Sequence, residues 1–116
     1  MNLETFNKII AEQVQRSTTV LIDKAEEYAT EDRLHNFKVA AEFLDSTLEK
    51  ACAGMMAKHT VSIYDKCNSG KTYPMSMWNE KITDHINYLL LLRAIVDKGE
   101  VTMYADGVPY NTVSRE

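Results

Sequence analysis

Three polar residues share one stripe of an otherwise apolar segment in the second half of the chain. Between Trp78 and Leu92, the side chains of Glu80, Asp84 and Asn87 are spaced by four and then three residues, which returns each to the same helix face. Apolar residues cover most of the remaining circumference, so this helix is expected to be central to the domain. Burying an unpaired carboxylate is costly. The stripe therefore predicts that these carboxylates face other protein groups, a bound cation or a water-filled pocket.

A second group of acids lies near residue 27, at the end of the first expected helix. Glu27 and Glu31 are four residues apart, where like charges on a helix repel each other unless a cation lies between them. Taken alone, this group is typical of a solvated acidic face that pairs with Lys24 and Arg33. Carboxylates from two facing helices are also how helical bundles hold Mg²⁺ or Mn²⁺. The presence of both groups therefore favours a Mg²⁺ or Mn²⁺ ion between the two helices over a merely solvated acidic face.

Four other side chains are candidates for contacts with a ligand. Lys58 would neutralise a phosphate, or would pair with Asp84 inside the protein. His59 lies on the expected apolar face, where a hydrogen-bonded core histidine is the more common role. Asn36 follows the acidic group and would reach a ligand or cap the next helix. Asn87 would orient a ligand or a water molecule.

Composition and charge exclude several classes of protein. The chain of 116 residues has a net charge of −4 and no basic run, whereas nucleic-acid-binding proteins usually carry a basic stripe. Its longest apolar run, residues 88–92, is far too short to span a bilayer. Its two cysteines lack metal-site spacing, which favours reduced thiols in a cytoplasmic protein. We therefore expect no nucleic-acid partner and no membrane.

The periodicity predicts an all-α bundle of three main helices. Apolar residues recur every three or four positions over residues 3–29 and 37–66, which predicts the first two helices. The apolar segment between Trp78 and Leu92 belongs to the third helix, which is expected from about residue 76 to 98. Residues 68–74 contain the loop between the last two helices. Residues 1–100 are expected to form one helical bundle domain, followed by a tail or small hairpin at 101–116. The long seam of the first helix favours self-association, as a dimer or a dimer of dimers.

Residues 27–37, 54–65 and 78–88 resemble small phage-borne proteins near the nucleotide-modification-associated domains. More remotely, they resemble the all-α nucleoside triphosphate pyrophosphohydrolases, the group of MazG and the dimeric dUTPases, over roughly residues 24–98. The motifs of that superfamily are Glu-Glu-x-x-Glu and Glu-x-x-Asp. Here Glu26 and Glu27 match the opening pair, Glu31 comes one position late, and Glu80 and Asp84 have three residues between them instead of two. On a helix, these spacings still keep the side chains on one face.

The resemblance implies a metal-dependent nucleotide-binding protein that acts on nucleotides during phage infection, in the host cytoplasm. In that superfamily, Mg²⁺ grips the triphosphate while water attacks and pyrophosphate leaves. The resemblance implies that Mg²⁺ is held by four ligands, Glu27, Glu31, Glu80 and Asp84. Glu80 and Asp84 would then be the catalytic pair. The alternative is a non-enzymatic phage accessory protein that binds and inhibits a host protein, in which the acids serve the structure.

Overall fold

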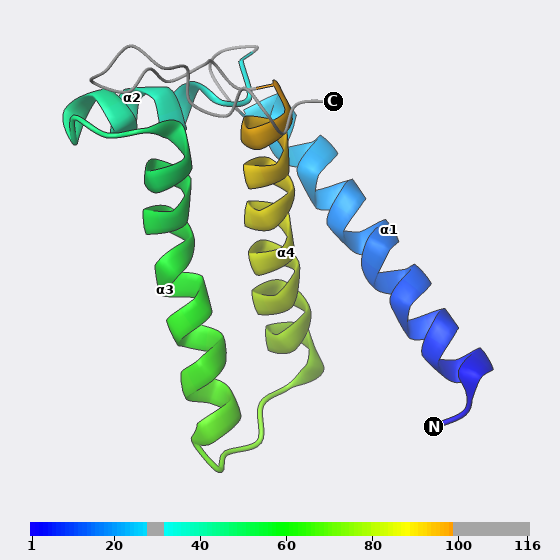
Figure 1. Ribbon diagram of the computed structural model, residues 1–116. Helices are drawn as coiled ribbons and strands as arrows, with labels where there is room; N and C mark the ends of the chain where they lie inside the picture. Colours follow the sequence, from blue (N-terminus) through cyan, green and yellow to red (C-terminus); the bar gives the residue numbers. More distant parts are fainter. Residues whose placement is uncertain (28–31, 99–116) are drawn as a thin grey trace.

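The structure is a computed structural model that describes residues 1–27 and 32–98, with the backbone alone at residues 25–27 and 98. These residues form four helices, α1 (Leu3–Glu27), α2 (His35–Phe43), α3 (Leu48–Asn68) and α4 (Met75–Lys98). The α3 and α4 helices lie side by side and antiparallel, α2 crosses one end of this pair, and α1 runs obliquely against α4 (Figure 1). The predicted all-α class is confirmed. The tail or hairpin expected at 101–116 lies outside the described residues.

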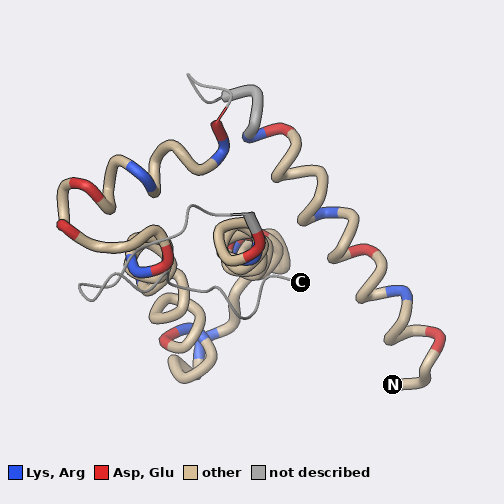
Figure 2. The backbone as a smooth tube through the Cα atoms, turned by 45° about the horizontal axis from the view of Figure 1, so that its top comes forward, with Lys and Arg blue, Asp and Glu red and all other residues tan. Residues whose placement is uncertain are grey.

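The α1 helix runs without interruption because local interactions support its first turns. The Asn2 side chain caps its start by accepting a hydrogen bond from the Thr5 amide at 2.8 Å. Farther along, charges of opposite sign alternate at intervals of four residues, and Figure 2 shows this alternation along the helix. An acid four residues before a base is a favourable pair on a helix surface. The predicted helix at 3–29 is thus confirmed as far as Glu27.

The single helix predicted over residues 37–66 is wrong, because the chain turns between α2 and α3. Asp45 adopts a φ of 49°, a left-handed conformation that ends α2. The Thr47 hydroxyl then caps α3 by accepting a hydrogen bond from the Lys50 amide at 3.2 Å. Short polar side chains such as Asp, Ser and Thr compete with the helix for backbone hydrogen bonds, so the run Asp45–Thr47 breaks it. The described bundle accordingly has three long helices, α1, α3 and α4, as predicted, and a short fourth helix, α2.

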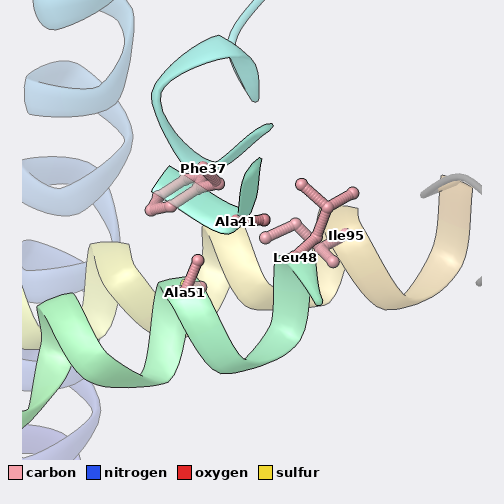
Figure 3. Close-up of a cluster of buried hydrophobic side chains, with 6 residues drawn as sticks. Phe37, Ala41, Leu48, Ala51 and Ile95 are labelled. Carbon is pink, nitrogen blue, oxygen red and sulfur yellow. The ribbon is translucent and has the colours of Figure 1, made fainter. Parts of the chain in front are cut away.

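The buried core lies at the end of the α3–α4 pair that α2 covers (Figure 3). Cys52 of α3 and Ile95 of α4 are completely buried there. Burial raises the pKa of the Cys52 thiol, which keeps it protonated. No helix in the described residues is long and apolar enough to cross a lipid bilayer. The core of the described part consists of Phe37, Ala41, Leu48, Ala51, Cys52 and Ile95.

Gly54 lies within α3, and its surroundings are open. A β-carbon at this position would meet no atom within 4 Å, so no neighbouring helix of the described chain packs closely against this glycine. Gly54→Ala is expected to raise the free energy of unfolding by about 0.5–1 kcal/mol, the usual cost of glycine inside a helix. Thermal unfolding followed by circular dichroism measures the change.

Gly70 supplies the control for this prediction. It has equally open surroundings, but its φ of 73° is one that side chains rarely adopt. Gly70→Ala should therefore lower the melting temperature while Gly54→Ala raises it. A lower melting temperature for Gly54→Ala would show that another surface packs against α3 at that point.

Candidate functional site

A cavity of about 140 Å³ lies where α1, α2 and α3 meet α4. Its apolar wall is formed by Leu21, Phe37, Met55, Tyr88 and Leu91. Its polar groups are Lys24, Arg33, Asn36, His59, Asp84 and Asn87. An apolar pocket with a few convergent polar groups is the usual form of a small-molecule site. We call this cavity the inner pocket.

Asn87 is the most deeply buried polar group of the inner pocket. Only 6% of the residue is exposed, and its Oδ1 atom is buried with no hydrogen-bond donor among the described residues. Leaving such an acceptor unpaired costs about 1–3 kcal/mol. Buried polar groups are almost always satisfied by protein, water or ligand. Asn87 is therefore the polar group of the inner pocket at which a donor from water, a ligand or another part of the protein would be most favourable.

Asp84 lies one helical turn before Asn87 and faces a cation. Its Oδ1 atom is 3.8 Å from Nζ of Lys24, which projects from α1. Exposed fractions are 21% for the Asp84 side chain and 50% for that of Lys24. The ion pair is thus partly open to solvent.

An open groove continues from Asp84 along the surface between α1 and α4. It has a volume of about 390 Å³ and is lined by Arg16, Val20, Lys24, Asn79, Glu80, Thr83 and Asp84. One bridge fixes its walls, because the Gln13 amide donates to the hydroxyls of both Ser17 and Thr83 at 3.0 Å. Ser17 and Thr83 are buried, so this bridge satisfies polar groups of two helices at once. We call this surface the α1–α4 groove.

His59 forms part of the inner pocket with an aromatic neighbour. Its ring lies against Tyr88 of α4, with ring centroids 4.9 Å apart and planes inclined by 37°. Burial lowers the pKa of His59, and the negative charge of Asp84 opposes this by raising it. A histidine with a lowered pKa is neutral at pH 7. His59 can therefore donate or accept a hydrogen bond with a ligand while its ring is uncharged.

The start of α2 brings two more residues to the inner pocket. Asp32 precedes this helix and accepts hydrogen bonds from Nζ of Lys38 and the Leu34 amide, both at 2.9 Å. These two bonds, with that of Lys38 the stronger, hold the pKa of the Asp32 carboxyl below its usual range. The turn ordered in this way leads into Arg33 and Asn36, which line the inner pocket.

The structure brings together several of the side chains predicted from the sequence, but not all of them. Asn36, His59, Asp84 and Asn87 line the inner pocket. Glu80 is exposed and lines the α1–α4 groove together with Asp84. In contrast, Lys58 is exposed and lines neither cavity, and the described cation that pairs with Asp84 is Lys24. The predicted contact of Lys58 with a phosphate stays a prediction.

Lys24 and Arg33 are the functional candidates that the sequence pattern did not single out. Both were expected only as partners of an acidic face, whereas both line the inner pocket. One signal was available for Lys24, which follows Leu21 by three residues and so shares the buried face of the first helix.

The predicted metal site is represented only in part among the described side chains. Glu80 and Asp84 line the same groove, while the side chain of Glu27 and the whole of Glu31 lie outside the described residues. Within the described part of the chain, no group of three or more His, Cys, Asp or Glu side chains could hold a metal ion. The structure thus places Glu80 and Asp84 in one groove, and their role as metal ligands stays a prediction.

Comparison of the chain with protein-family models, curated proteins and solved structures finds no match. The fold class, the inner pocket and the α1–α4 groove rest on the structure itself. The motif resemblance seen in the sequence rests on the residues quoted for it. These are the grounds for the function proposed below.

Proposed function

We propose that the protein binds a nucleotide between α1 and α4 and hydrolyses it with Mg²⁺, as the pyrophosphohydrolases that it resembles do, in the cytoplasm of the infected host. The observation that carries this proposal is the buried Oδ1 atom of Asn87, which lacks a donor in a pocket that also presents Asp84. A nucleotide supplies both N–H and O–H donors and a negatively charged tail. The two adjoining cavities offer complementary surroundings for these parts.

The inner pocket suits the uncharged part of a nucleotide. Tyr88 and Phe37 contribute aromatic surface, against which a ring can stack or pack at its edge. Asn87 offers its amide to polar atoms on the ring or sugar, and neutral His59 adds a second hydrogen-bonding group. Since the walls are largely apolar, these few polar groups would set the orientation of the ligand.

The α1–α4 groove suits the phosphate end of the nucleotide. Mg²⁺ would be held there by Glu80 and Asp84, with Glu27 and Glu31 as the two other ligands that the resemblance implies. Bound there, it would supply positive charge to neutralise the phosphates. Arg16 and Lys24 add two cationic side chains to the groove. The groove thus combines carboxylates that can bind a cation with cationic side chains that can bind an anion.

Incubation with a panel of ribo- and deoxyribonucleoside triphosphates and Mg²⁺ tests this proposal. Pyrophosphate release is expected from at least one of them, and Glu80→Gln should stop the release while leaving the melting temperature unchanged. Glu42→Gln, at an exposed acid of α2, is the matched control and should retain full activity. Silence across the whole panel would refute the hydrolase function and leave the accessory protein that binds a host protein as the better account.

We also propose that the chain self-associates through the first half of α1. Every side chain from Leu3 to Glu12 is exposed, and this half of the helix diverges from α4 (Figure 1). Phe6 is 50% exposed and Ile10 is 45% exposed, although they continue the apolar seam that packs on α4 farther along. Isolated helices of this length are marginal in water, so a second copy that covers the seam would stabilise it.

A further inference from the structure

Two side chains form a shared wall between the inner pocket and the α1–α4 groove. Lys24 and Asp84 are the described residues that line both cavities. Their ion pair therefore stands where a ligand would pass from one cavity to the other. Its 3.8 Å separation is long for a charge-assisted hydrogen bond. Half of the Lys24 side chain is exposed, and such exposed pairs are weak, so Lys24 can change its partner easily.

The volume of the inner pocket shows that a nucleotide cannot fit inside it alone. A cavity of about 150 Å³ in another protein holds one benzene molecule. The inner pocket, at about 140 Å³, therefore has room for a single six-membered ring. The remainder of the ligand must extend past Lys24 and Asp84, and the α1–α4 groove of about 390 Å³ is the space beyond them.

The groove is electrically balanced in the structure as it stands. Arg16 and Lys24 are its cations, and Glu80 and Asp84 are its acids. Arg16 is already oriented, because its Nη1 donates to the Gln13 side chain at 3.1 Å. Lys24, in contrast, faces Asp84. An anion in the groove therefore meets the charge of Lys24 partly offset by that of Asp84 beside it, and neutralising Asp84 removes this offset.

We propose that Lys24 is an anion-binding residue that stays paired with Asp84 until the charge of Asp84 is neutralised. Neutralising Asp84, by a bound cation or by substitution, releases Lys24 to pair with a polyphosphate in the groove beside Arg16. This inference rests on the proposed function, since it names the residue that meets the phosphates of the nucleotide. It also makes Lys24 the residue that couples cation binding at Asp84 to anion binding in the groove.

Calorimetric titration with inorganic tripolyphosphate, in a buffer with EDTA, tests the release without a metal or a nucleoside. Asp84→Asn should bind the anion about tenfold more tightly than the unaltered protein, because Lys24 gains a charge-assisted contact. Adding Lys24→Met to Asp84→Asn should remove that gain, whereas adding Lys24→Arg should keep it. Asp84→Ala provides a second way to remove the carboxylate if the asparagine variant folds poorly.

Asp23→Asn is the matched control, since it removes an exposed carboxylate from the same helix as Lys24 and changes the net charge equally. It should leave the affinity for tripolyphosphate unchanged. The proposal is overturned if Asp84→Asn binds no more tightly, if Asp23→Asn gives the same gain, or if Lys24→Met leaves the gain intact. Pyrophosphate release that coexists with any of these outcomes would keep the hydrolase function and reject only the role of Lys24. If the expected gain appears in a protein that hydrolyses no nucleotide, the role of Lys24 is kept and only the hydrolase function is rejected.

Discussion

Asn87→Leu is expected to stabilise the fold and abolish ligand binding at the same time. The Asn87 Oδ1 atom is buried without a donor, so replacing the amide with an apolar side chain of similar size removes an unmet polar group. Relief of that cost is worth about 1–3 kcal/mol in the free energy of unfolding. Urea denaturation measures the gain, and titration with the nucleotide found by the activity panel measures the loss of binding. Most substitutions in a protein destabilise it, so a gain of this size would be distinctive.

Thr83→Val is the control for this prediction on the same helix. Thr83 is as buried as Asn87, but its hydroxyl accepts a hydrogen bond from the Gln13 amide. Removing that hydroxyl leaves the Gln13 donor with one partner fewer and should lower the free energy of unfolding. If Asn87→Leu lowered it to the same extent, Asn87 would have a protein partner after all. The strongest observation in favour of ligand binding in the inner pocket would then be removed.

A double substitution in the first half of α1, Phe6→Asp with Ile10→Asp, is expected to convert a dimer into a monomer. The apolar seam contributes about 25 cal/mol for each Å² that it buries, and two carboxylates within it would repel a second copy. Light scattering should show a mass near 13.2 kDa for the variant and twice that for the unaltered protein. Helical content should also fall, since the first turns of α1 would lose their cover.

Gln15→Asp tests whether charge alone explains such a change. This exposed residue lies on the opposite side of α1 from the seam, so its substitution should leave the dimer intact. The unaltered protein running as a monomer at micromolar concentration would reject self-association directly. Leu21, which belongs to the same seam, is unsuitable for this test because it lines the inner pocket.

Apolar periodicity predicted the helices that are long and regular, and missed a turn that depends on local hydrogen bonds. The bounds of α1 and α4 follow closely from the pattern of the chain. The break between α2 and α3 did not, because Phe37, Ala41, Leu44 and Leu48 keep a helical spacing across it. Only the run of Asp, Ser and Thr at residues 45–47 marks the break, through backbone hydrogen bonds that periodicity does not register.

The same distinction between local and distant information applies to the candidate site. Asp84 and Asn87 were found because one helix determines their common face. Lys24 was overlooked as a ligand contact because its pairing with Asp84 joins positions sixty residues apart, which a helical pattern cannot anticipate. Lys58 and His59 are neighbours on α3, so their side chains point about 100° apart, and only His59 reaches the inner pocket.

The division of α1 into two halves has an evolutionary consequence. Its second half supplies Leu21 and Lys24 to the inner pocket, so changes there alter ligand recognition directly. The side chains from Leu3 to Glu12 are all exposed, and none of them lines either cavity that Lys24 lines. Under the proposed function, selection could therefore diversify the first three turns, and with them the proposed contact with a second copy, while the proposed ligand recognition is inherited unchanged. Descendants of this chain would be expected to differ first in what they assemble with, and only later in what they bind.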